Sequence, residues 1–345
     1  MNNQPFFTIG IPVYNAAKYL SLSFGSVFGQ SFTDWEIIAV DDGSRDDSLE
    51  IVKEYAKADS RIRVIEKANA GPAAARNTMM YAAKGRYIIF LDSDDAMCGE
   101  ALQKAYDAIT ANNFPDILHA GFIRVVVDTE TECACPYPGD EYFADGITKD
   151  ERWAKLWLDG KTVDHICAKF FRTEFLRTAG LAMHTRLWAQ EDNEFIEKCY
   201  RKANTMAYGD FFAFRYYKQR ENSLSTAWSY KAVLGVLSRW ADFYQDVELF
   251  DITAETKERL RNSKTDLVRQ LRSGTLGIAS KRPKEECFKL IDMLDSYFGS
   301  EIRKLPVAEG GLNSIIFRMY RIFGLKRTYS WLYAYLEKKG AVLKH

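Results

Sequence analysis

The chain has 345 residues, 47% hydrophobic and 27% charged, enough to bury a full core as one large domain with an appendage or as two domains. Its 47 basic residues balance its 47 acidic residues, so no overall positive field attracts nucleic acid. No apolar run approaches the roughly 18 to 20 residues that cross a bilayer, and the N-terminus lacks a secretory pattern. We therefore expect a cytoplasmic protein.

The cysteines and histidines give no sign of a zinc site or a disulfide framework. Six cysteines are scattered without a CxxC pair: Cys98, Cys133, Cys135, Cys167, Cys199 and Cys287. The closest pair, Cys133 and Cys135, lacks the further Cys or His partners that zinc requires. His165 and His184 have no ligand spacing either, and we interpret them as structural.

Short apolar runs alternate with helical patterns over the first 122 residues. Strands are predicted at 6–13, 36–40, 62–66, 87–91 and 116–122. Ser44 and Asp47 suggest a capping box for one helix, and Gly71 and Pro72 open the next, which ends at Gly85. This alternation predicts an α/β fold: a mostly parallel sheet with helices on both faces, whose ligands bind at the carboxyl ends of the strands.

After about Ser225 strand-like runs disappear and helical periodicity dominates, which predicts a helical C-terminal region at 226–345. Two apolar helical stripes lie at 312–323 and 329–336, and 318–345 carries seven basic residues against one acidic residue. These stripes fit peripheral contact with an anionic membrane surface, and they fit equally well packing on the catalytic domain or in a homo-oligomer.

Two predicted strands end in carboxylates. The strand at 87–91 runs into Asp92, Asp94 and Asp95, and the strand at 36–40 runs into Asp41 and Asp42. Two oxygen ligands one residue apart suit Mg²⁺ or Mn²⁺ bound mainly through substrate phosphates. Either segment alone is also explained by a turn whose aspartates cap the next helix. Two acidic strand ends in one half-domain favour the metal site.

Five segments in this order carry a family resemblance: IPVYNAAKYL, VDDGSRDDS, NAGPAAARN, FLDSDD and QEDNEF. Together they resemble the family 2 inverting glycosyltransferases with the GT-A fold, over about residues 6–225. The resemblance implies a Rossmann-like GT-A catalytic domain at 1–225, with a nucleotide-binding part at about 1–122 and an acceptor part at about 123–225. The region at 226–345 resembles no family that we can assign.

The resemblance implies roles around a nucleotide. Pro12 and Tyr14 would line the base, although Tyr14 could instead pack in the core. Asp41 resembles the aspartate that contacts uracil, because a carboxylate can accept the imide N–H of that base. Arg76 resembles the arginine that reaches toward the nucleotide, and the alternative is a salt bridge on the helix surface.

The same resemblance assigns the DSD triplet. It places Asp92 and Ser93 beside the nucleotide, Asp92 also near the metal, and Asp94 as the direct ligand of Mn²⁺ or Mg²⁺. A divalent ion there suits the departure of a nucleoside diphosphate, because it neutralises developing negative charge.

Inverting transfer to a hydroxyl also needs a carboxylate that accepts the proton of the acceptor. QEDNEF implies that Asp192 is this base and that Glu191 orients the acceptor; alternatively, both acids only favour a helix dipole. Weaker resemblances at 165–176 and 216–225 bring Lys169 and Arg220 to the acceptor or diphosphate. A structural salt bridge explains Lys169 equally well.

The resemblance therefore implies an enzyme that moves a hexosyl or N-acetylhexosaminyl group from a nucleotide-sugar, expected to be a UDP-sugar, to a saccharide hydroxyl. The family suggests bacterial surface polysaccharide assembly on a lipid-linked acceptor, in the cytoplasm or peripherally at the cell membrane. A dinucleotide dehydrogenase would need GxGxxG after its first strand, which is absent. The alternative from another class is a saccharide- or nucleotide-binding module without turnover.

Overall fold

The computed structural model describes residues 4–135, 146–159, 165–185, 191–218 and 249–260, with single positions between 327 and 338. The chain divides into two compact units, one of residues 1–186 and 190–226, the other of residues 187–189 and 227–345. In the second unit, residues 254–260 and the single described positions are helical. Arg220 and the apolar residues of both predicted C-terminal stripes lie outside the described residues.

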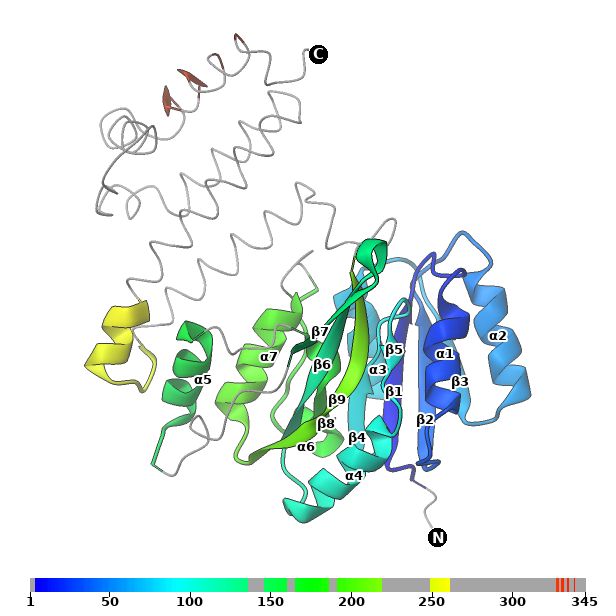
Figure 1. Ribbon diagram of the computed structural model, residues 1–345, viewed down its shortest axis with the longest axis horizontal. Coiled ribbons are helices and arrows are strands. Elements are labelled where there is room, and N and C mark those ends of the chain that lie inside the picture. Colours follow the sequence, from blue (N-terminus) through cyan, green and yellow to red (C-terminus); the bar gives the residue numbers. More distant parts are fainter. Residues whose placement is uncertain are drawn as a thin grey trace. The chain divides into compact units, whose positions relative to one another are not determined.

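The first half of the sheet is parallel, and its strands lie at the predicted segments (Figure 1). Its strands lie side by side in the order β3-β2-β1-β4. Their bounds are β1 Phe7–Val13, β2 Trp35–Asp41, β3 Ile62–Glu66 and β4 Tyr87–Phe90. Every residue of β2 and β4 is buried, and so is all of β1 except Pro12. Such continuous burial is typical of a parallel sheet covered on both faces.

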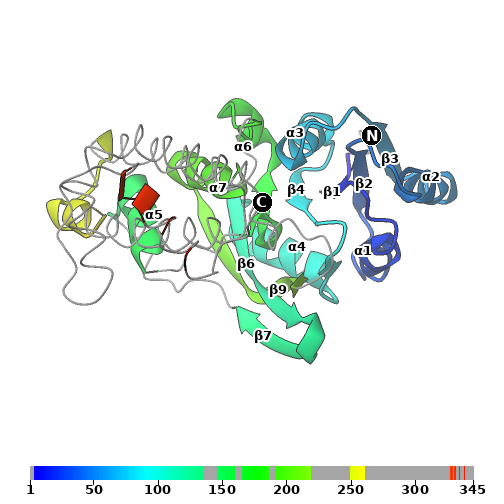
Figure 2. The same cartoon turned by 90° about the horizontal axis from the view of Figure 1, so that it is seen from above.

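Helices cover both faces of this half. Two of them, α1 (Leu20–Phe28) and α2 (Ser48–Ala58), pack together, and α3 (Pro72–Ala82) lies on the opposite face (Figure 2). α3 approaches β1 closely because Gly10 has no side chain: a Cβ there would lie 2.8 Å from the sulfur of Met79. The predicted capping box of α2 is wrong. Asp47 makes no side-chain capping bond, and Ser44 Oγ instead accepts the N–H of Asn15 at 3.1 Å.

The second half of the sheet is mixed, which corrects the expectation of a mostly parallel sheet. β8 runs antiparallel between β4 and β6, β9 pairs parallel with β6, and β5 and β7 pair antiparallel with β9 and β6. The bounds are β5 Ala96–Met97, β6 Ile117–Val126, β7 Thr131–Cys135, β8 Lys169–Arg172 and β9 Met206–Lys218. The helices here are α4 Ala101–Ala111, α5 Lys149–Leu158, α6 Thr173–Thr178 and α7 Glu191–Lys202. In the described part of the chain, no helix is both long and apolar enough to span a bilayer.

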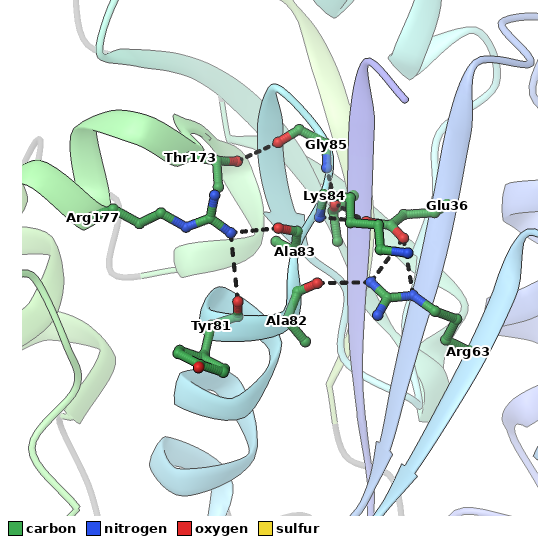
Figure 3. A network of polar contacts seen from close by, with 10 residues as sticks. Glu36, Arg63, Tyr81, Ala82, Ala83, Lys84, Gly85, Thr173 and Arg177 are labelled. Carbon is green, nitrogen blue, oxygen red and sulfur yellow. Dashed lines mark hydrogen bonds and ion pairs between the residues drawn. The ribbon is translucent and has the colours of Figure 1, made fainter. Parts of the chain in front are cut away.

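The C-terminal end of α3 is held by arginines from two different elements (Figure 3). Arg63 on β3 donates to the carbonyl of Ala82 at 2.7 Å, and Arg177 on α6 donates to that of Ala83 at 2.5 Å. Arg63 also pairs with the buried Glu36 at 2.9 Å. Cations at the C-terminal end of a helix satisfy its last carbonyls and complement its dipole. α3 is therefore fixed against the sheet at this end.

Gly85 makes the tight connection from α3 into β4. A Cβ at this position would lie 2.4 Å from the backbone nitrogen of Thr8, so no larger residue fits there. The Gly85 N–H donates to Thr8 Oγ1 at 2.8 Å, and its carbonyl accepts from Thr173 Oγ1 at 2.7 Å. β4 is thereby fixed in position before it delivers the acidic triplet to its other end.

Candidate active site

The loops after β1 and β2 meet at the carboxyl edge of the sheet and are tied together. The Asn15 side chain accepts the N–H of Arg45 at 2.8 Å, and Ser48 Oγ accepts the N–H of Ala16 at 2.8 Å. β1 lies between β2 and β4, and the chain reaches these two neighbours through helices on opposite faces. This is the point in an α/β sheet where the connections diverge and ligands bind.

Asp41, at the end of β2, carries an unsatisfied acceptor. Its Oδ2 atom accepts the N–H groups of Gly43 and Ser44, both at 3.1 Å. Its Oδ1 atom is buried and finds no hydrogen-bond partner within the described residues. A buried polar atom without a partner is costly, and it indicates a ligand or functional role. An N–H donor from a bound molecule would satisfy this oxygen.

Pro12 and Tyr14 flank Val13, which pairs with Asp41 in the register of β1 and β2. Pro12 is half-buried, and Tyr14, which follows β1 directly, is 46% exposed. That exposure excludes the alternative that Tyr14 packs in the core. An exposed ring beside the edge of the sheet is available to a planar ligand, and the assignment of these two residues to a base stays a prediction.

Asp42 has a positioning function that sequence reasoning missed. It is buried and accepts Lys67 Nζ at 2.5 Å and the N–H groups of Ala70 and Gly71 at 3.0 and 2.8 Å. These bonds fix the segment that leads into α3. The only available signal was the second acid of VDDGS, and two adjacent acids give no indication of which one faces a ligand and which one holds a loop.

The DSD triplet follows β4 after one residue, Leu91. Asp92, Ser93 and Asp94 are half-buried, whereas Asp95 is buried and its Oδ1 accepts the N–H of Tyr217 at 3.0 Å. Asp95 therefore anchors the turn to β9. Among the described residues, no three His, Cys, Asp or Glu side chains gather into a complete metal site. The chemistry of Asp92 and Asp94 fits an ion held by one or two carboxylates and by phosphates.

Arg76 links the triplet to α7. Its Nη2 lies 2.8 Å from Asp92 Oδ1, and its Nη1 lies 3.1 Å from Glu191 Oε1. The arginine side chain is only 8% exposed, so it does not form a helix-surface salt bridge. Burial alone lowers the pKa of Arg76, but the carboxylates of Asp92 and Glu191 outweigh this effect and raise it. The guanidinium is therefore a permanent cation at this site.

Glu191 and Asp192 lie in the first turn of α7, where acids complement the helix dipole. Burial and then the charge of Asp192 raise the pKa of Glu191 to about 7, although Arg76 opposes the rise. Asp192 is half-buried, and its Oδ1 accepts the N–H of Asn193 at 2.9 Å. The structure thus brings the predicted acid pair to the triplet through Arg76.

Lys169 lies apart from solvent. It is fully buried on β8, and its Nζ donates to the His165 carbonyl at 3.0 Å. Burial, followed by the charge of Lys169, lowers the pKa of His165 to about 4, so this imidazole is neutral near pH 7. His165 packs against the rings of Phe122 and Tyr216, at centroid distances of 4.7 and 4.6 Å. A role for Lys169 at the acceptor or diphosphate stays a prediction.

The parallel half-sheet, its mixed continuation and the acidic turn after β4 together define an α/β domain of the GT-A type. Residues 8–131 match the family model described as Glycosyl transferase family 2. The crystal structure of S. aureus TarS 1-349 in complex with UDP-GlcNAc has the same fold. It gives a TM-score of 0.65 at 20% identity, covering 97% of this chain and 92% of that one.

Two curated relatives are glycosyltransferases by name. The chain is 32% identical over 224 residues to the uncharacterized glycosyltransferase EpsJ of Bacillus subtilis, covering 64% of this chain and 63% of EpsJ. It is 30% identical over 219 residues to the poly(ribitol-phosphate) beta-glucosyltransferase of Bacillus spizizenii, covering 62% of this chain and 32% of that enzyme. The chain thus spans less than two thirds of the length of these relatives.

Proposed function

We propose that the protein is an inverting glycosyltransferase that moves a sugar from a UDP-sugar to a hydroxyl group of a saccharide. The observation that carries the proposal is the buried Oδ1 of Asp41 at the carboxyl edge of the parallel strands, which finds no hydrogen-bond partner in the described part of the chain. Uracil presents an imide N–H that this oxygen can accept, whereas the corresponding ring nitrogen of cytosine is itself an acceptor. The likeness to a fold that binds UDP-GlcNAc in TarS supports the same donor class.

We assign residues of the site to both the proton transfer and the departure of the diphosphate. Asp192 accepts the proton of the acceptor hydroxyl as that oxygen bonds to the anomeric carbon. The bond between the anomeric carbon and the diphosphate breaks on the opposite side, and UDP leaves with the electron pair. Asp94 and Asp92 would hold Mn²⁺ or Mg²⁺, which when bound neutralises charge on the diphosphate. Arg76 contributes a fixed cation beside Asp92.

The acceptor class is proposed from the relatives. The poly(ribitol-phosphate) beta-glucosyltransferase of Bacillus spizizenii acts, by its name, on poly(ribitol-phosphate). We extend this to bacterial surface polysaccharide assembly, with a hexosyl or N-acetylhexosaminyl group transferred to a lipid-linked saccharide. A cytoplasmic enzyme, peripherally attached to the membrane through the basic C-terminal tail, would meet such an acceptor. Flotation with anionic liposomes, comparing the full chain with a truncation before Gly311, tests that attachment.

The donor site is tested by calorimetry with UDP, GDP and CDP, each with and without Mn²⁺. We expect selective UDP binding that Mn²⁺ strengthens and that Asp94→Ala weakens. Asp47→Ala is the matched control, because Asp47 is an exposed acid in the neighbouring loop whose side chain makes no capping bond. Absence of nucleotide binding by folded wild-type protein would overturn the proposal.

Turnover is tested separately by release of UDP from UDP-hexoses and UDP-N-acetylhexosamines in the presence of saccharide acceptors. We expect acceptor-dependent UDP release with inversion at the anomeric carbon. UDP binding without any release across the donor series would instead favour a nucleotide-binding module of the same fold.

A further inference from the structure

Arg76 joins two parts of the proposed site that are distant in the sequence. Asp92 follows β4, and Glu191 begins α7, 115 positions from Arg76. One guanidinium contacts both, through Nη2 to Asp92 at 2.8 Å and Nη1 to Glu191 at 3.1 Å. Side-chain exposure is 8% for Arg76 and 9% for Glu191, against 35% for Asp92. The ion pair of Arg76 with Glu191, which lies next to the proposed base Asp192, is therefore more buried than its ion pair with Asp92.

The helix that carries Arg76 cannot move easily. At its N-terminal end the N–H of Gly71 donates to the buried Asp42, and at its C-terminal end Arg63 and Arg177 hold its last carbonyls. Close packing of α3 on Gly10 fixes its distance from β1. Arg76 thus projects from a rigid helix. Its two hydrogen bonds therefore fix the positions of Asp92 and Glu191, and Arg76 does not itself move to reach them.

The local charge balance explains why an arginine is needed. Asp92, Glu191 and Asp192 all act on Arg76 as negative charges. A planar guanidinium can direct separate N–H groups at two carboxylates, whereas the ammonium of lysine is a single point charge. Without the cation, Glu191 would be left as an enclosed carboxylate next to the charge of Asp192, and the first turn of α7 would lose its ion pair beside the triplet.

We propose that Arg76 is a positioning residue that holds Glu191, and through it the first turn of α7 with Asp192, at a fixed place relative to the triplet. This inference rests on the proposed function and differs from the expectation that this arginine reaches the nucleotide. It assigns Glu191 to the positioning of the base rather than to direct contact with the acceptor. The side chain of Arg76 thereby connects Asp92 of the proposed donor site to the helix turn that carries the proposed base.

A double-mutant cycle tests the proposal, using Arg76→Met, Glu191→Gln and the double variant. We expect each single change to lower kcat by about 10- to 100-fold, as changes to groups that orient reacting residues do. The double variant should lose no more than the worse single variant, because both remove the same contact. Glu191→Gln should leave UDP affinity near that of wild type. Additive losses of kcat, or a loss confined to UDP affinity in Arg76→Met, would overturn it.

Two further variants sharpen the cycle. Arg76→Lys keeps the charge but lacks the planar, fixed set of N–H donors of a guanidinium, so we expect it to retain UDP binding and not to restore kcat. Glu194→Gln is the matched control on the same helix turn, because Glu194, whose side chain is 16% exposed, pairs with Lys198 rather than with Arg76. Loss of kcat in Glu194→Gln equal to that in Glu191→Gln would contradict a specific role for the Arg76 bond.

Amide hydrogen exchange of the ligand-free full chain provides a readout that does not depend on activity. We expect Glu191→Gln and Arg76→Met to accelerate exchange in residues 191–196, and Glu194→Gln to leave it unchanged. Unaltered exchange in both variants would overturn the positioning role. If wild-type protein transfers no sugar, the proposed function fails while this measurement still decides the inference. Should Arg76→Met not fold, Glu191→Gln alone carries the test.

Discussion

The two halves of the sheet are built differently. β3, β2, β1 and β4 run parallel, are joined by helices, and are buried almost continuously. β8, β6, β9, β7 and β5 pair mainly antiparallel and enclose polar groups, since Asp116, His119 and Lys169 are each at most 1% exposed. Both halves have an apolar core, and the second half adds fully buried charged or titratable groups on or beside its strands.

This difference extends to the site. In the first half Asp41 and Asp42 are oriented by backbone N–H groups of adjacent loops. In the second half the first turn of α7 is linked to the triplet by a long-range contact through Arg76. Changes in the first half should therefore alter nucleotide affinity, and changes at α7 should alter turnover.

The largest effect is expected in the second half, for Asp192→Asn. Removal of a general base typically costs about 10²- to 10⁴-fold in rate, so kcat should fall by that factor while UDP affinity stays unchanged. Transfer assays and calorimetry on the same preparation measure the two quantities. Asp210→Asn, which changes an exposed acid on β9, is the control and should keep full activity. Full activity of folded Asp192→Asn would remove this residue from the role of base.

A smaller effect is expected in the first half, for Asp41→Asn, and it should appear in UDP affinity rather than in kcat. Loss of a charged acceptor for the imide N–H should cost about 2 kcal/mol, or about 30-fold in the Kd for UDP. An amide can also donate to cytosine, so the preference for UDP over CDP should shrink. Calorimetry with both nucleotides gives the ratio, and Asp47→Asn serves as control. An unchanged ratio would mean that Asp41 Oδ1 does not face the base.

The sequence allowed the first half to be predicted because each strand is a short apolar run followed by a helical pattern. It did not predict β8 or β9. β8 has only four residues, and the thirteen residues of β9 include charged and aromatic side chains without clean alternation. The pairing of β6 with β9 also shifts register around Gly121. In the second half of the sheet, strand direction depends on which strands pair in the folded protein, and a local sequence pattern cannot predict this pairing.

The site was predictable in the same uneven way. The acids at the ends of β2 and β4 stand out because they interrupt buried runs, and QEDNEF was found through family resemblance. The bond between Arg76 and Glu191 spans 115 positions, and spacing cannot reveal it. The capping box failed for a related reason, since Ser44 is recruited by the loop after β1 instead of by its own helix.

Asp116 fastens the second half at the amino end of β6, and it should make this half sensitive to acid. It accepts a salt bridge from Arg172 and the N–H groups of Asn204 and Thr205 at 2.7 and 3.1 Å. Burial alone raises the pKa of Asp116, but these hydrogen bonds lower it by more. The unfolded chain then holds the proton more tightly than the folded chain, so acid favours unfolding.

The stabilisation from Asp116 should be present above its ordinary pKa of 3.8 and be lost as pH falls through the lower pKa of the folded state. Asp116→Asn should cost about 1.5 kcal/mol near neutral pH, the lower range for a hydrogen bond to a charged group. Urea unfolding of wild type and Asp116→Asn, at several pH values from about 3 to about 7, measures the difference in their free energies of unfolding. If the difference in the free energy of unfolding between the two proteins does not become smaller toward acid pH, ionised Asp116 does not stabilise the fold in this way.

The smallest effect compares the two arginines that hold α3, one from each half. Arg177→Met removes hydrogen bonds from a largely exposed side chain to the last carbonyls of the helix and should cost about 1 kcal/mol. Arg63→Met should cost more, because it also leaves the carboxylate of Glu36, 8% exposed, without its cation. Urea unfolding with unchanged m-values measures both. Equal losses would show that the carbonyl bonds, and not the Glu36 pair, dominate the anchoring of α3 to the parallel half.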